Sequence, residues 1–201
     1  MVLYIHGKGG SADEAEHYVP LFPGEEVLGF DYRAETPWEA KEEFPAFVSA
    51  LCRIHGPLTL IANSIGAFFA MCAGLDAWTK RAFFVSPVAD MEKLITGMMT
   101  WADVTEEELR KKRTIPTDFG ETLSWEYLTW VREHPLRWKA PTEILYGEKD
   151  ALISRGTVSA FAAGIGAGLT VMKGGEHWFH TDKQMRFLDE WIRAKSEEIG
   201  S

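Results

Sequence analysis

The 201-residue sequence lacks several features that would point directly to a function. It has only two cysteines, Cys52 and Cys72, which lie in apolar helical patterns and not at metal-ligand spacing. We expect both thiols to be free, buried and inert, as is usual in a reducing cytoplasm. Basic residues number 21 against 30 acidic ones, giving a net charge of −9. This balance argues against nucleic acid as a partner, because nucleic-acid binding usually needs a basic patch.

Long apolar runs are also missing. No window approaches the roughly 18 uninterrupted apolar residues of a membrane span. No basic region followed by a hydrophobic stretch of signal-peptide length comes after Met1, so we expect a cytoplasmic protein without a membrane span. There is no internal repeat and no low-complexity segment. The content of 46% hydrophobic and 25% charged residues is typical of a globular protein, and we predict a single domain over residues 1–201.

Short apolar runs alternate along the chain with amphipathic helical segments. This β-α-β alternation predicts an α/β fold, with a mostly parallel sheet and helices on both faces. The expected strands are Val2–Ile5, Glu26–Phe30, Leu58–Ala62, Ala82–Val85, Glu143–Tyr146 and Leu169–Met172. The expected helices of the main repeat are Ala12–Val19, Pro37–His55 and Asp182–Glu198. Capping boxes are predicted at Ser11–Glu14, Thr36–Glu39, Thr105–Glu108 and Thr181–Gln184.

One interval, residues 90–138, interrupts this alternation. It has helical patterns at Asp90–Trp101, Thr105–Lys112 and Ser124–Glu133, and we interpret it as a helical lid inserted within the domain. Its apolar side chains, with one from a later loop, are candidates for substrate binding, and an apolar lid can equally be a dimer surface. The candidates are Met98, Trp101, Trp125, Trp130 and Trp178. Alternatively, the aromatic residues of the insertion only pack it onto the core.

The most informative stretch is the pentapeptide 62–66, Ala-Asn-Ser-Ile-Gly, between an expected strand and an expected helix. A serine on such a turn, with small residues two positions before and after, is typical of a nucleophile elbow. The turn would hold Ser64 in a strained conformation, and bulky flanking residues would collide with the neighbouring strand or helix. Ala62 stands where the usual G-x-S-x-G pattern has glycine. The same pattern also occurs by chance in loops, so the rest of the chain has to support it.

A serine nucleophile needs a base, usually histidine. Of the six histidines, His177 lies in a glycine-rich loop between the last expected strand and the last helix. We prefer it to His180, which lies three residues later at the helix entry. His6 is better explained as a structural or pocket-wall residue. The remaining histidines, His17, His55 and His134, are interpreted as surface or packing residues.

A carboxylate should orient the histidine, and Asp150 is the best candidate. It follows the expected strand Glu143–Tyr146, at the sheet edge where sites of open α/β folds collect. The alternatives are that Asp150 only caps a turn, or that Glu148 is the acid.

An oxyanion hole completes the predicted site. The backbone N–H of Ile65, directly after the serine, would supply one donor. The second should come from the loop 6–11, where glycines allow close approach to a substrate, and we choose the N–H of Lys8. A glycine-rich loop is also found in phosphate-binding sites, but this one lacks the spacing of G-x-G-x-x-G and of the P-loop.

In chain order, the glycine-rich loop, Ser64, Asp150 and His177 resemble the α/β-hydrolase superfamily, over nearly the whole chain. The resemblance implies that these three residues are nucleophile, orienting acid and base. It implies that the N–H groups of Lys8 and Ile65 form the oxyanion hole, and that the insertion is the family's lid. A serine nucleophile argues against the dehalogenase and epoxide hydrolase branches, which use aspartate there.

The chain departs from the family pattern at Ala62 and at its start, which corresponds to the family's third strand. The resemblance therefore implies about six parallel strands, in the order 4-3-5-6-7-8 of family numbering. It also implies an esterase-like serine hydrolase for a small-molecule acyl substrate, without metal or cofactor, as a monomer or homodimer. Thioesterase, lactonase and amide hydrolase stay open, as does a slow-turnover ligand-binding protein on the same fold.

Overall fold

The computed structural model describes residues 1–197, and they form two compact units. The first unit comprises residues 1–89 and the chain from Arg137 onward, and the second comprises Asp90–Leu136. The last helix, α7, is described over Asp182–Glu197, so the expected final residue Glu198 lies outside the described residues. In this part of the chain, no helix combines the length and apolar character needed to cross a membrane.

A six-stranded sheet organises the first unit, and every neighbouring pair of its strands is parallel. The strands are β1 (Val2–Ile5), β2 (Val27–Gly29), β3 (Leu58–Asn63), β4 (Thr79–Val85), β7 (Thr142–Gly147) and β8 (Gly168–Met172). Their order in the sheet is β2-β1-β3-β4-β7-β8. The predicted number, direction and order of strands are therefore confirmed.

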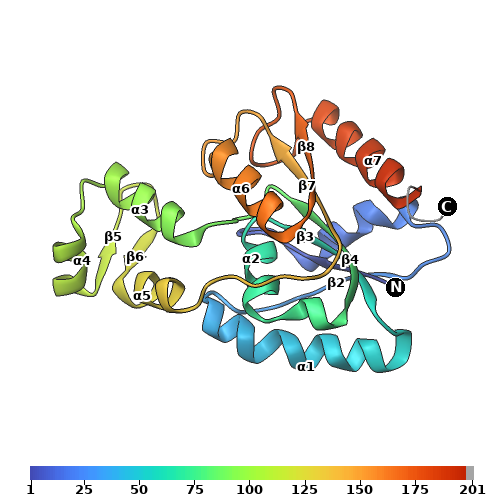
Figure 1. Ribbon diagram of the computed structural model, residues 1–201, viewed down its shortest axis with the longest axis horizontal. Helices are drawn as coiled ribbons and strands as arrows, with labels where there is room; N and C mark the ends of the chain where they lie inside the picture. Colours follow the sequence, from blue (N-terminus) through green and yellow to red (C-terminus); the bar gives the residue numbers. More distant parts are fainter. Residues whose placement is uncertain (198–201) are drawn as a thin grey trace. The chain divides into compact units, whose positions relative to one another are not determined.

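The helices of the first unit cover both faces of the sheet (Figure 1). They are η1 (Ala12–Leu21), α1 (Pro37–His55), α2 (Ile65–Cys72), η2 (Leu75–Trp78), α6 (Arg155–Ile165) and α7. Because alternate residues of a strand point to opposite faces, Tyr4 and Phe83 pack in one buried cluster with residues of η1 and α7. On the opposite face, α2 lies against Ile5, and Phe69 of α2 packs edge-on against Phe44 of α1.

Two of the predicted helix caps behave differently. At α1, the Thr36 side chain accepts from the Glu39 N–H, and the Glu39 carboxylate accepts from the Thr36 N–H, so the capping box is present. At η1, Ser11 makes no side-chain capping bond, and the segment is a 3₁₀-helix. The prediction of a box there is wrong because the Glu14 carboxylate instead accepts a hydrogen bond from the Tyr4 hydroxyl.

The second unit has three helices and a small hairpin. Its elements are α3 (Met91–Trp101), α4 (Glu106–Lys112), β5 (Thr114–Pro116), β6 (Thr122–Ser124) and α5 (Trp125–Glu133). The helices agree with the sequence prediction, whereas the antiparallel β5–β6 pair was not predicted. The Arg132 guanidinium of α5 bridges Glu92 of α3 and Glu106 of α4, with N···O distances of 2.7 and 2.8 Å.

Candidate active site

Ser64 lies on a sharp turn between β3 and α2. Its φ of 52° and ψ of −118° fall where residues other than glycine are strained. The turn is fixed by its backbone: the Ser64 N–H donates to the Val85 carbonyl (2.9 Å), and the Val88 N–H donates to the Ser64 carbonyl (3.2 Å). A Cβ on Gly66 would lie only 2.3 Å from the His6 carbonyl oxygen, so this position has room for glycine alone.

His177 connects the serine to an acid. The Ser64 Oγ lies 2.8 Å from His177 Nε2, and His177 Nδ1 lies 2.7 Å from Asp150 Oδ2. A carboxylate accepts hydrogen bonds, so Nδ1 carries the proton and Nε2 is left to accept the serine hydroxyl. The imidazole is 16% exposed and the Asp150 side chain 0%, so the hydrogen bond between them is largely shielded from solvent.

Asp150 serves its own loop as well as His177. Its second oxygen, Oδ1, accepts from the N–H groups of Leu152 (2.8 Å) and Ile153 (2.9 Å). The Tyr146 hydroxyl donates to the Ile153 carbonyl (2.7 Å) and holds the far side of this loop. The turn-capping alternative for Asp150 is thus true of one oxygen, while the other contacts the imidazole.

Backbone contacts join the loop of Asp150 to the loop of His177. The Lys149 N–H donates to the Gly175 carbonyl (2.7 Å), and the Glu148 N–H donates to the Met172 carbonyl (3.0 Å). A Cβ on Gly147 would lie 2.3 Å from the Glu176 carbonyl oxygen, so the two loops meet at bare backbone. Glu148, the alternative acid, accepts from the Gly174 N–H through its carboxylate and supports this junction.

The loop after β1 approaches the serine from the other side. Residues 7–10 form a tight turn, in which the Gly10 N–H donates to the Gly7 carbonyl (3.1 Å). Gly9, the third residue of this turn, has a positive φ of 74°. A Cβ on Gly7 would lie 3.2 Å from the Ser64 Cβ, so the loop backbone passes directly beside the serine. Lys8, the next residue of the loop, lines the same cavity as Ser64. Ile65 begins α2, where N–H groups have no acceptor within the helix.

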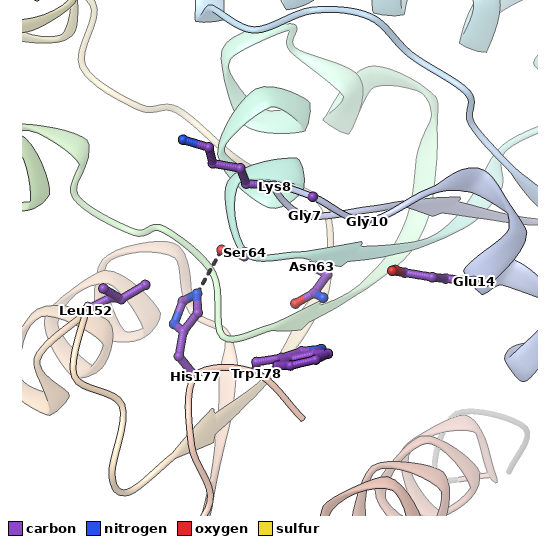
Figure 2. Close-up of a pocket in the computed structure, with 10 residues that line it drawn as sticks. Gly7, Lys8, Gly10, Glu14, Asn63, Ser64, Leu152, His177 and Trp178 are labelled. Atoms are coloured by element: carbon purple, nitrogen blue, oxygen red, sulfur yellow. Dashed lines mark hydrogen bonds between the residues drawn. The ribbon is translucent and has the colours of Figure 1, made fainter. Parts of the chain in front are cut away.

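Ser64, His177 and the loop after β1 border a cavity of about 340 Å³ in the first unit (Figure 2). Leu152 lies on one side of the Ser64–His177 pair, and Asn63, Glu14 and Trp178 lie on the other. The cavity is lined by Gly7, Lys8, Gly9, Gly10, Glu14, Asn63, Ser64, Leu152, His177 and Trp178. No three His, Cys, Asp or Glu side chains within residues 1–197 are grouped so that they could hold a metal ion.

The other histidines have separate contacts. His180 stacks on Trp178 at 4.4 Å, and its Nδ1 lies 2.8 Å from the Trp178 carbonyl oxygen. His6 stacks on Tyr32 at 4.2 Å, and the Tyr32 hydroxyl donates to the His6 carbonyl. His17 pairs with Asp189, and His134 stacks on Trp130.

Of the five predicted substrate-binding residues, Trp178 lines the cavity and is 66% exposed. The other four, Met98, Trp101, Trp125 and Trp130, belong to the second unit, and their role stays a prediction. Sequence reasoning missed three lining residues, Asn63, Leu152 and Glu14. Asn63 and Leu152 could have been found, because they neighbour Ser64 and Asp150 in the sequence. Glu14 was interpreted only as part of a helix cap.

No protein-family model and no curated protein sequence matches the chain. Solved structures do resemble it. Est1E from Butyrivibrio proteoclasticus has a TM-score of 0.79 at 18% identity, with 98% of this chain and 86% of that chain covered. Alpha/beta hydrolase domain-containing protein 10 from mouse has a TM-score of 0.74 at 16% identity, with 98% and 90% covered. A thermophilic esterase has a TM-score of 0.62 at 18% identity, with 99% and 90% covered.

The parallel sheet, its strand order and these structural neighbours together show that the protein has the α/β-hydrolase fold. Within the described residues, the six strands of this sheet correspond to the third to eighth strands of the larger family pattern, with β1 as the third and β2 as the fourth.

Proposed function

We propose that the protein is a serine hydrolase that cleaves a carboxylic ester, or a related acyl compound, through an acyl-enzyme on Ser64. The observation that carries the proposal is the hydrogen-bonded row of Asp150, His177 and Ser64, with the serine on a strained turn. A hydroxyl that donates to a neutral imidazole, itself held by a buried carboxylate, is the arrangement that makes serine nucleophilic. The esterases among the structural neighbours are consistent with this chemistry.

The reaction would proceed in two halves. Ser64 Oγ attacks the carbonyl carbon while its proton moves to His177 Nε2, and the resulting imidazolium is stabilised by Asp150. The tetrahedral intermediate collapses, the leaving alcohol takes the proton from His177, and the acyl group stays on Ser64. Water then attacks the acyl carbon, giving its proton to His177. Collapse of the second intermediate releases the acid and returns the proton to Ser64 Oγ.

The charge that develops on the carbonyl oxygen needs donors that are already in place. We assign the backbone N–H groups of Ile65 and Lys8 to this role. Ile65 lies at the start of α2, where the helix dipole favours negative charge. The loop of Lys8 passes beside Ser64 with glycines that leave the backbone accessible. One such donor contributes about 3–4 kcal/mol to transition-state stabilisation in enzymes of this type.

The 90–136 unit is proposed as the lid, and its Met98, Trp101, Trp125 and Trp130 as contacts for an apolar part of the substrate. Thioesters, lactones and amides pass through the same tetrahedral intermediate, so these substrates stay within the proposal. A slow-turnover binding protein on this fold is the alternative from another class, and tight product retention would favour it.

The first test is the substitution Ser64→Ala. We expect it to lower hydrolysis of short p-nitrophenyl esters by at least about a thousandfold and to abolish labelling by a fluorophosphonate probe. The variant Ser49→Ala, which removes a hydroxyl from α1 instead, serves as the matched control and should keep wild-type labelling. Mass spectrometry of the labelled peptide locates the adduct. Labelling that persists in Ser64→Ala at another residue would exclude Ser64 as the nucleophile.

A further inference from the structure

The cavity has a polar wall that the proposed hydrolysis does not use. Asn63, Glu14 and Trp178, together called the Glu14 wall here, lie on the side of Ser64 opposite Leu152 (Figure 2). Of the ten lining residues, Glu14 and Lys8 carry a formal charge. The Lys8 side chain extends away from His177 and from Glu14, so the two ends of the cavity differ in charge.

A hydrogen bond from Tyr4 holds the carboxylate of Glu14 in place. Its Oε2 accepts a hydrogen bond from the hydroxyl of Tyr4, whose ring is buried in β1 at 1% exposure. Its Oε1 accepts no hydrogen bond from residues 1–197, and it lies beside the Cα of Gly10, where a Cβ would come within 2.8 Å. One oxygen therefore fixes the carboxylate, and the other is left to accept a donor in the cavity.

The Trp178 indole lines the same side of the cavity as this carboxylate. The Trp178 ring is 66% exposed, and the His180 ring stacks against one of its faces at 4.4 Å. Because Trp178 lines the cavity and most of its surface is exposed, a ligand in the cavity can contact the ring. A carboxylate and an indole ring that line the same side of a cavity make a favourable environment for an organic cation, by charge and by cation–π attraction.

We propose that the Glu14 wall binds a protonated amine of the substrate, so that the enzyme prefers acyl compounds carrying a positive charge near the scissile bond. The Glu14 carboxylate accepts from the ammonium, the Trp178 face covers its methylene groups, and the Asn63 amide oxygen can take a second N–H. The wall discriminates against acidic substrates, because their carboxylates would face Glu14. This inference rests on the proposed hydrolase activity and names the substrate class of that site.

A charge series of esters tests the inference. One set carries a terminal ammonium, a methyl or a carboxylate on the acyl chain, and a second set carries the same groups on the alcohol. In one of the two sets we expect the wild-type protein to give the highest kcat/KM with the ammonium ester and the lowest with the carboxylate ester. The ratio of ammonium to methyl ester should fall when salt rises from about 0.02 M to about 0.5 M.

The variant Glu14→Gln keeps an acceptor for Tyr4 and removes the charge. We expect the ammonium-to-methyl ratio of kcat/KM to fall about fivefold, mainly through KM, because exposed ion pairs contribute about 1 kcal/mol. The matched control is Glu16→Gln, which removes an exposed carboxylate from the same 3₁₀-helix without touching the cavity, and should keep the ratio. Tyr4→Phe removes the supporting hydrogen bond, keeps the charge, and should change the ratio less than Glu14→Gln does.

Two results would overturn the inference. One is a wild-type protein that shows no preference for the ammonium ester in either set, which needs no variant at all. The other is Glu14→Gln lowering all three esters equally, since that would mean the carboxylate only braces β1 against η1. Failure of the hydrolase proposal itself would look different, because then no ester in either set would be cleaved and Ser64 would not be labelled.

Discussion

Gly66 shows how little space the turn around Ser64 allows. A methyl group there would lie 2.3 Å from the His6 carbonyl and 2.8 Å from the Ile5 carbonyl, and neither backbone atom can move without disturbing β1. By contrast, Ala62 at the other flank is fully buried within β3 and pairs in regular register with both neighbouring strands. The first glycine of the usual pattern is therefore dispensable here, and the second is not.

We predict that Gly66→Ala lowers the free energy of unfolding by about 3 kcal/mol, the cost of overpacking against atoms that cannot relax. Gly97→Ala is the control, because Gly97 lies within α3 with nothing near its Cβ position, and alanine there should stabilise the protein by about 0.5–1 kcal/mol. Urea unfolding followed by circular dichroism gives both values. Equal stability of the two variants would contradict the steric reading of the elbow.

At the scale of elements, two segments with the same capping-box motif differ, because Thr36 caps its helix and Ser11 does not. We predict that Thr36→Ala lowers the free energy of unfolding by about 1 kcal/mol, because it removes the acceptor for the Glu39 N–H. Ser11→Ala should cost less than about 0.3 kcal/mol, since its side chain makes no capping bond. The two are compared by thermal and urea unfolding. A loss at Ser11 as large as that at Thr36 would show that η1 is capped in solution.

Element positions could be predicted well where the pattern is local. The strands were located by their apolar runs. Their predicted first and last residues differ from the observed ones by at most three positions, as at β4, which begins at Thr79 instead of Ala82. The start of β4 was missed because Thr79, Lys80 and Arg81 lie at a strand end that is only partly buried, where polar residues are tolerated. The β5–β6 hairpin was missed because three-residue strands carry almost no periodic signal.

The molecule as a whole should lose stability at alkaline pH. Burial raises the pKa of Tyr18 well above its usual range, and the charges of Glu14 and Asp189 raise it further. Burial likewise raises the pKa of Tyr4 above its usual range and that of the Cys72 thiol to about 12. Such groups favour the folded state while they stay protonated, so their contribution is complete below the unfolded pKa, about 9–10, and is lost as pH rises toward the folded pKa.

We therefore predict a decline in the free energy of unfolding above pH 10, with each of these groups contributing up to about 1.4 kcal/mol per pH unit. Tyr18→Phe should make the decline shallower by about that amount, because the variant has no phenol to ionise after unfolding. Urea titrations from about pH 8 to about pH 11.5 measure the slope. A slope that Tyr18→Phe leaves unchanged would mean that this hydroxyl is solvated in the folded protein.

The catalytic residues could be predicted because they lie after the ends of strands, which the sequence locates. Ser64 directly follows β3, and Asp150 and His177 lie in the loops after β7 and β8, while parallel strands bring their carboxyl ends to one edge of the sheet. The Glu14 wall was not predictable in this way, because it depends on which partner the Glu14 side chain takes. Sequence favoured the Ser11 N–H, whereas packing of η1 over β1 places the Tyr4 hydroxyl closer.

Ser64 and His177 are 113 residues apart in sequence, and the imidazole reaches the serine only after β7, β8 and the loop between the last strand and α7 are in place. Domains generally fold as units during synthesis. The elbow and its base belong to the same unit, so we expect both to be put in place in one folding step. Ser64 should therefore become reactive only after the residues through His177 have been synthesised and folded.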